Sequence, residues 1–169
     1  MSRRVFLTLA LGAAALSACA PTAYGPPPSP IYNADDFAWA ARSGDSSIDG
    51  RVDYRDQDMT FRCAGTVGLA PETGYTRQRF QALYGSTERA AVPAAVVRAR
   101  TVDEPTNQYR DSLREARCDS DGRFLFTDLP AGSWYVIAPA TAAGAEGPVV
   151  LMRRVTTRPG RSVAVTLGD

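Results

Sequence analysis

The chain has 169 residues with 19 basic and 18 acidic side chains and no histidine, and every basic residue in the printed sequence is an arginine. Without histidine or lysine it has no imidazole for a Ser–His–Asp triad or a His-ligated metal, and no amine for a Schiff base. The near balance of interleaved charges argues against a nucleic-acid partner. We therefore expect one domain that is not an enzyme and binds no cofactor or metal.

Residues 1–18 have the organisation of an export signal. Arg3 and Arg4 precede an apolar stretch that is too short to span a bilayer, since a helix needs about 20 residues to do so. The stretch ends in Leu-Ser-Ala before Cys19. This ending resembles the bacterial lipobox, whose cysteine becomes the lipidated first residue of the mature protein. The alternative is an ordinary secretory signal with a chance cysteine.

The lipobox resemblance implies that Cys19 carries acyl chains such as palmitate, which hold the protein on a membrane without spanning it. Ala20, in place of an aspartate, implies by the same resemblance an outer-membrane lipoprotein facing the periplasm. The sequence around Arg3 and Arg4 is similar to the twin-arginine export motif, and a generic basic start remains the alternative.

Residues 19–46 are expected to form a tether and a short docking segment. The prolines before Ile31 favour extended polyproline II structure and oppose a packed core. The segment Asn33–Arg42 predicts a short helix with Asn33 as its N-cap. Phe37 and Trp39 would dock this helix onto the domain.

From residue 47 the sequence alternates between apolar and polar residues, as half-buried β-strands do. Turn signals separate seven such segments. The predicted strands are Ser47–Tyr54, Thr66–Ala70, the charged edge strand Tyr109–Cys118, Gly122–Asp128, Ser133–Pro139, Val149–Thr157 and Ser162–Leu167. Short strands with regular turns predict an all-β sandwich.

An insertion over residues 75–108 interrupts this pattern. Tyr75–Tyr84 predicts a helix that ends at Gly85, with Phe80 and Leu83 on one face. The rest of the insertion is loop-like, and its length is unusual for a connection between strands.

The predicted strands around the turn at Asp119, together with the first and last predicted strands, match the sequence pattern of a known family. Asp119 to Trp134 fits D-x-x-G-x-F-x-F-x-x-L-P-x-G-x-Y, with Trp134 in place of the final tyrosine. This resembles the signature of carboxypeptidase regulatory-like domains and of the wider transthyretin-like and collagen-adhesin B-type sandwiches. Residues 48–52 and 161–167 are similar to the first and last strands of these domains. The resemblance implies that residues 47–169 form a seven-stranded, prealbumin-like Greek-key β-sandwich with one short inserted helix.

The resemblance also bears on activity. Transthyretin-like hydrolases depend on histidines, and collagen-adhesin domains crosslink through lysine, so neither chemistry is available to this chain. The regulatory domains of carboxypeptidases are themselves non-catalytic. The resemblance therefore implies a non-enzymatic module.

Two short segments of the signature invite a functional interpretation. Trp134 lies in phase with Val136 and is expected in the core, although a sugar-stacking platform is the alternative. Tyr135 lies out of phase and is expected to face solvent or the inserted helix. Asp119 and Asp121 predict a hairpin turn, because the further acidic ligands of a calcium loop are absent.

Three cysteines are present. If Cys19 is lipidated, Cys63 and Cys118 remain as a pair in an oxidising periplasm, which favours a structural disulfide. Two buried thiols or a redox pair are the alternatives.

We expect the protein to serve as an interaction or structural module whose partner is an envelope protein or a glycan. Arginine suits bidentate contacts with carboxylate or phosphate, although each arginine could simply be solvated. The possible partner surface comprises Arg77, Arg79, Tyr84, Arg89 and Tyr135.

Two other functions remain as alternatives. The first is a carbohydrate-binding module that uses Tyr135, Trp39 or Tyr84 as exposed aromatics. The second is an enzyme with paired carboxylates, for which the candidates are Asp53, Asp56 and Asp58. These three aspartates are better explained as solubilising charges.

Overall fold

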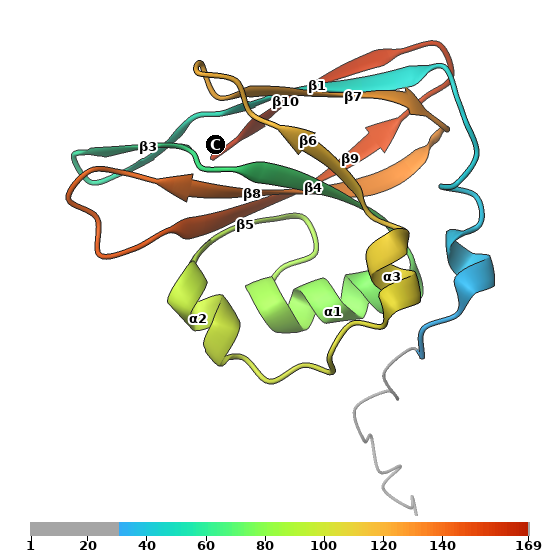
Figure 1. Cartoon of the computed structure of the whole chain (residues 1–169), viewed down its shortest axis with the longest axis horizontal. Helices are drawn as coiled ribbons and strands as arrows, with labels where there is room; N and C mark the ends of the chain where they lie inside the picture. The colour runs from blue at the N-terminus through green and yellow to red at the C-terminus, as the bar shows by residue number, and fades with distance from the viewer. Residues whose placement is uncertain (1–30, 169) are drawn as a thin grey trace, which may run out of the picture.

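The computed structural model describes residues 31–168, so the predicted export signal, Cys19 and the proline-rich segment lie outside it. The described chain forms two packed sheets and a layer of helices on one outer face (Figure 1). The small sheet contains β1 (Ser46–Val52), β7 (Arg123–Leu129) and β10 (Ser162–Leu167). The large sheet contains β2 (Tyr54–Asp56), β3 (Met59–Cys63), β4 (Thr66–Pro71), β5 (Arg89–Pro93), β6 (Arg114–Arg117), β8 (Gly132–Thr141) and β9 (Val149–Thr157).

Strand β8 lies at the centre of the large sheet. One of its edges pairs antiparallel with β4 and β3, and the other pairs antiparallel with β9. Beyond these strands, β6 pairs with β4 and β5 pairs with β9. In the small sheet, β1 is antiparallel to β7 and parallel to β10. The β-sandwich prediction is thus supported in outline, with a mixed strand arrangement.

The prediction of seven strands is wrong, because residues 31–168 contain ten. The hairpin of β2 and β3 was not predicted, and neither was β5, which has little alternation and pairs at one edge. The predicted edge strand over 109–118 is divided between a helix and β6. The helix forms because the Thr106 side chain caps it by accepting the N–H of Tyr109.

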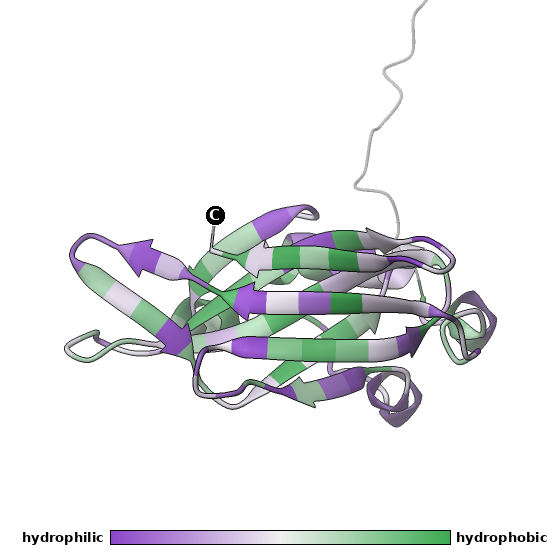
Figure 2. Ribbon diagram, turned by 90° about the horizontal axis from the view of Figure 1, so that it is seen from above, coloured by the Kyte–Doolittle hydropathy of each residue, from purple (hydrophilic) through white to green (hydrophobic). Residues whose placement is uncertain are grey.

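The main core lies between the two sheets. Apolar residues from alternate positions of the strands point into it, and Figure 2 shows this alternation as bands of contrasting hydropathy. Phe124, Phe126 and Trp134 are buried there, as the sequence predicts. The Trp134 indole N–H donates to the Thr157 hydroxyl at 3.2 Å. Trp134 is therefore a core residue and not a sugar platform.

Three helices form a layer, called the helical layer below, over the outer face of the large sheet (Figure 1). They are α1 (Gly74–Tyr84), α2 (Ala94–Ala99) and α3 (Asn107–Asp111). The predicted helix over 75–84 is confirmed, whereas the expectation of a single inserted helix in an otherwise loop-like insertion is wrong, because α2, α3 and β5 also form there. Thr73 and Thr76 cap the start of α1 reciprocally, and Gly85 ends the helix with a left-handed φ of 75°.

The helical layer has a small core of its own. Phe80 of α1 is buried with Ala70, Tyr135 and Met152, which project from the outer face of β4, β8 and β9. The insertion is therefore packed onto the sheet. No helix within residues 31–168 has the length and apolar character needed to cross a membrane.

The segment before β1 docks as predicted, although its helix is shorter. The 3-10 helix η1 covers Ala34–Phe37, and the Asn33 side chain caps it. Phe37 is buried, and the Trp39 ring lies 4.8 Å from the Trp134 ring. Residues two apart cannot share one helical face, so a continuous helix could not place both rings. A Cβ on Gly132 would lie 2.2 Å from Trp39.

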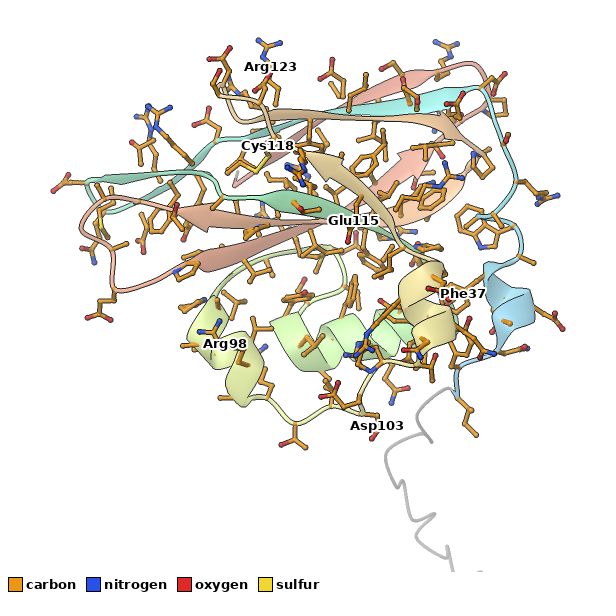
Figure 3. All side chains as sticks on the ribbon, viewed as in Figure 1. Phe37, Arg98, Asp103, Glu115, Cys118 and Arg123 are labelled. Carbon is orange, nitrogen blue, oxygen red and sulfur yellow. A yellow bond between two sulfur atoms is a disulfide. The ribbon has the colours of Figure 1, made fainter. Side chains whose placement is uncertain are left out.

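The Cys63–Cys118 disulfide is confirmed. It joins β3 to the residue after β6, with a Cα–Cα distance of 6.3 Å and a sequence separation of 55 residues (Figure 3). The bridge therefore closes one side of the sandwich, where the chain passes from β6 into β7.

We predict that the double substitution Cys63→Ala and Cys118→Ala lowers the free energy of unfolding by about 4 kcal/mol, because the bridge restricts a long loop in the unfolded chain. Urea denaturation with and without reductant measures the loss. The reductant should destabilise the wild type and leave the double variant unchanged. Equal stability of the oxidised wild type and the variant would contradict the prediction.

Candidate functional site

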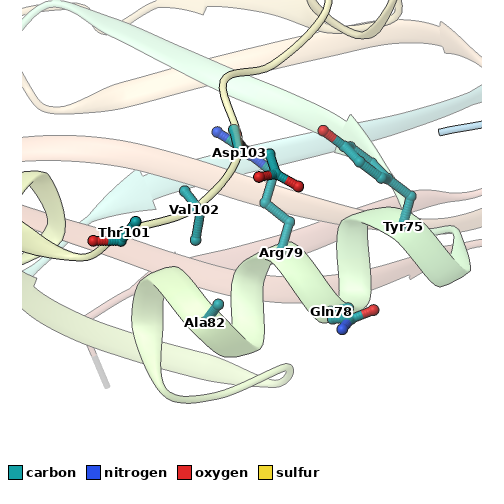
Figure 4. Close-up of a pocket in the computed structure, with 7 residues that line it drawn as sticks. All are labelled: Tyr75, Gln78, Arg79, Ala82, Thr101, Val102 and Asp103. Carbon is teal, nitrogen blue, oxygen red and sulfur yellow. Dashed lines mark hydrogen bonds between the residues drawn. The ribbon is translucent and has the colours of Figure 1, made fainter. Parts of the chain in front are cut away.

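The helical layer contains an open hollow of about 220 Å³ between α1 and the chain that leads from α2 to α3 (Figure 4). We call it the helical hollow. Its lining residues are Tyr75, Gln78, Arg79, Ala82, Thr101, Val102 and Asp103. Both walls thus belong to the insertion.

The helical hollow follows from the periodicity of α1. Residues three or four apart on a helix lie on one face, and Tyr75, Arg79 and Ala82 have this spacing. Figure 4 shows them on the side of α1 that faces the chain carrying Val102 and Asp103. One turn of helix therefore separates each of these three side chains from the next.

Two arginines hold the opposite wall in place. The Arg79 guanidinium donates to the backbone carbonyl of Asp103. The Arg100 guanidinium donates to the carbonyl of Leu83, near the end of α1, at 2.6 Å. Both contacts run between α1 and the following chain, so they fix the width of the helical hollow.

Tyr75 of the helical hollow also belongs to a cluster of four rings, Tyr32, Phe37, Tyr75 and Tyr109. The Tyr75 ring lies 5.2 Å from the Tyr109 ring and 5.7 Å from the Tyr32 ring, and both contacts are edge-on. The Arg79 guanidinium lies 5.9 Å from the centre of the Tyr109 ring. Burial raises the pKa of Tyr109 well above its usual value. The ring cluster thus joins the start of the described chain to α1 and α3.

The lining of the helical hollow is suited to binding. It combines a partly exposed aromatic ring, a guanidinium, a carboxamide and one carboxylate, Asp103. Such side chains hold polar ligands by stacking and directed hydrogen bonds. Acid–base cleavage of a glycosidic bond uses two carboxylates, and the lining supplies one.

The structure gives the predicted surface arginines different roles. Arg77 forms an ion pair at 2.6 Å with Glu72, whose side chain is 5 % exposed. The Arg154 Nε donates to the other oxygen of Glu72 at 2.6 Å, so Glu72 ties α1 to β9. Arg79 holds the wall of the helical hollow. Arg89 lies apart from them, exposed on β5.

Tyr135 is not a surface residue. It is fully buried because α1 covers the outer face of β8, and its ring lies 4.7 Å from Phe80. Its hydroxyl has no hydrogen-bond partner among residues 31–168. Burial raises the pKa of Tyr135 to about 12, and the charge of Glu72 adds to the effect. The prediction that Tyr135 belongs to a partner surface is therefore wrong.

The other aromatic candidates are also engaged in packing. Tyr84 is partly buried, with its ring 5.3 Å from Phe80, and burial raises its pKa to about 12. Trp39 is partly buried against Trp134. These rings do not form a common platform with Tyr135.

The acidic candidates lie in turns and at strand ends. Asp53 pairs with Arg51, and Asp56 and Asp58 are exposed in the β2–β3 hairpin. The Asp119 carboxylate accepts the N–H groups of Asp121 and Arg123, which fits the predicted turn. Within residues 31–168, no three His, Cys, Asp or Glu side chains lie close enough together to hold a metal ion.

The sequence reasoning missed Tyr75 and Asp103 as binding candidates. Tyr75 could have been found, since it precedes Arg79 by four residues on a helix that was predicted. Asp103 could not, because the fold of the following chain is required to bring it back to α1.

Comparison with known proteins finds a similar fold but identifies no family for this chain. No family model matches the chain, and no curated protein matches it. The structure is similar to a crystal structure described as "a putative carbohydrate binding protein (PA1324)" from Pseudomonas aeruginosa, with a TM-score of 0.59 and 22% identity over 83% of this chain and 99% of that one. A second match, the minor pilin GBS52 of Streptococcus agalactiae, has a TM-score of 0.38 and 19% identity over 77% of this chain and 44% of that one. The first likeness supports a shared β-rich fold.

We predict that Tyr135→Phe leaves the free energy of unfolding unchanged or raises it by up to about 1 kcal/mol, because the variant removes a buried hydroxyl without a partner. Above pH 10, the usual tyrosine pKa, the unfolded wild type releases this proton and the folded protein keeps it. Stability therefore falls as pH rises from about 10 to 12, and less steeply in the variant. Urea denaturation across this range measures both effects. A loss above 1 kcal/mol at neutral pH would contradict the prediction.

Proposed function

We propose that this chain is a non-enzymatic lipoprotein of the bacterial cell envelope, with a carboxypeptidase regulatory-like sandwich whose helical layer is the binding face. The observation that carries the proposal is the helical hollow, because the insertion builds both of its walls and lines it with polar and aromatic side chains. The absence of histidine and lysine from the sequence supports binding without catalysis.

The anchoring part of the proposal rests on the lipobox resemblance at Cys19. Ile31 begins the described chain, and its neighbour Tyr32 contacts the ring of Tyr75, which lines the helical hollow. The proposed tether would therefore join the domain at Ile31, beside the helical layer.

A glycan is the second candidate ligand, and a specific feature favours it. The lining of the helical hollow offers one ring for stacking and several planar polar groups, a combination that suits sugar hydroxyls. The similarly folded Pseudomonas aeruginosa protein, which is described as a carbohydrate binding protein on a provisional basis, supports the same class of ligand.

We predict that the full-length chain, expressed in a proteobacterial host, fractionates with the outer membrane and carries acyl chains on its N-terminal cysteine. Cys19→Ala should abolish both properties, because the acyl chains supply the anchor. Membrane fractionation and mass spectrometry of the purified protein measure them. A wild-type protein that is cleaved but unmodified would contradict the lipoprotein assignment.

We predict that Ala82→Trp weakens ligand binding at least about tenfold by filling the helical hollow. Ala82 is exposed and lines it, so the larger side chain removes no existing contact. Gln81→Trp, on the same helix but outside the lining, is the matched control. Binding is measured by crosslinking to envelope proteins and on an array of bacterial envelope glycans. Equal binding by both variants would exclude the helical hollow, and signal confined to the glycan array would identify the second candidate.

A further inference from the structure

The small sheet is narrower than the large sheet, and one strand of the large sheet is left uncovered. Ala91 of β5 pairs with Leu151 of β9, and directly paired residues point to the same face of a sheet. Leu151 is buried in the core between the sheets, whereas Ala91 is exposed. The face of β5 that points toward the small sheet is therefore open. A fourth strand beside β10 would cover it.

The edge of β10 is suited to receive such a strand. In a parallel pair, alternate residues direct their backbone groups to the neighbouring strand. The Arg161 carbonyl accepts the N–H of Ser47 in β1, and the Leu167 carbonyl accepts the N–H of Asp53, the residue after β1. The residues in phase with Arg161 and Leu167 therefore face β1. The backbone groups of Ser162, Ala164 and Thr166 accordingly face outward. The Thr166 carbonyl confirms this direction, because the Arg153 guanidinium binds it from outside the sheet at 2.8 Å.

A groove runs along this edge. Two hollows of about 550 and 430 Å³ share Thr156, Val163 and Ala164 and together extend over the length of β10. A third hollow of about 260 Å³ lies beside Ala91 and Arg153. We call these three hollows the β10 groove. It lies on the opposite face of the large sheet from the helical layer.

The β10 groove is positively charged. Arg158 and Arg161 line one end, and Arg153 lines the middle. Among residues 31–168, no carboxylate lines any of the three hollows. Charges of this kind deter a second copy of the same edge, because pairing would bring like charges together. They attract an acidic strand instead.

We propose that the β10 edge binds an extended acidic segment of a partner protein, which adds to the small sheet as a fourth strand. The backbone of Ala164 and its outward-facing neighbours supplies the hydrogen bonds, and the arginines select glutamate or aspartate side chains. The Arg153 guanidinium releases the Thr166 carbonyl to the incoming strand and pairs with a carboxylate. This interaction is independent of the proposed function of the helical hollow.

The test uses a capped synthetic peptide of alternating glutamate and valine, with amide hydrogen exchange of the full-length protein as the readout. The peptide should slow exchange of the Ala164 and Thr166 N–H groups at least about tenfold. The same peptide with N-methyl groups along one edge, or with arginine in place of glutamate, should not. Absence of protection in β10 overturns the proposal.

Two variants separate the backbone and charge contributions. Ala164→Pro removes an outward-facing N–H without removing a bond to β1, and it should abolish peptide binding. Arg158→Glu with Arg161→Glu should weaken binding about tenfold or more. Arg55→Glu with Arg62→Glu, an equal charge change on the β2–β3 hairpin, is the control.

Each outcome decides for or against the proposal. Binding that survives both Ala164→Pro and the charge reversal in the β10 groove overturns it, and so does an equal loss in the hairpin control. Protection of β10 that appears without peptide and grows with protein concentration would assign the edge to a second copy and also overturn it. The charge-reversal pair keeps the test valid if Ala164→Pro fails to fold.

Discussion

The burial of β8 on both faces is the constraint on which the rest of the structure depends. Trp134 and Val136 point into the core between the sheets, and Tyr135 points into the core beneath α1. Because the middle of this strand is buried on both faces, the domain needs a covering layer on each side. The small sheet provides one and the inserted helices provide the other. The insertion thus completes the domain and at the same time builds the helical hollow.

Arginine makes many of the directed polar contacts between these layers. Arg153 and Arg154 are adjacent on β9 and point to opposite faces, so one reaches the edge of β10 and the other reaches Glu72 beneath α1. Arg100 and Arg114 donate to backbone carbonyls of segments distant in sequence. A planar guanidinium offers several donors in fixed directions, which suits it to such contacts better than an ammonium group.

The likeness to the Pseudomonas aeruginosa protein concerns the fold alone, so the function must be inferred from the residues of this chain. At 22% identity the two share an arrangement of strands. The helical hollow and the β10 groove differ in chemistry, since the first combines an aromatic ring with mixed polar groups and the second is lined by arginines. They lie on opposite faces of the large sheet, so one bound partner need not exclude another.

The β-rich sandwich and the helix over 75–84 could be predicted from the sequence, and the cysteine count favoured the Cys63–Cys118 disulfide over free thiols. Alternation, helix-ending residues and cysteine count are local or compositional signals. The sequence excluded histidine and lysine chemistry for the same reason. The tertiary structure alone decided that Tyr135 is buried and that Asp103 faces α1. It also decided that β5 extends the sheet. Each of these features depends on which segment of the chain covers which face of the sheet. That choice is made by packing between residues far apart in the sequence, and the alternation of residues within one strand carries no information about it.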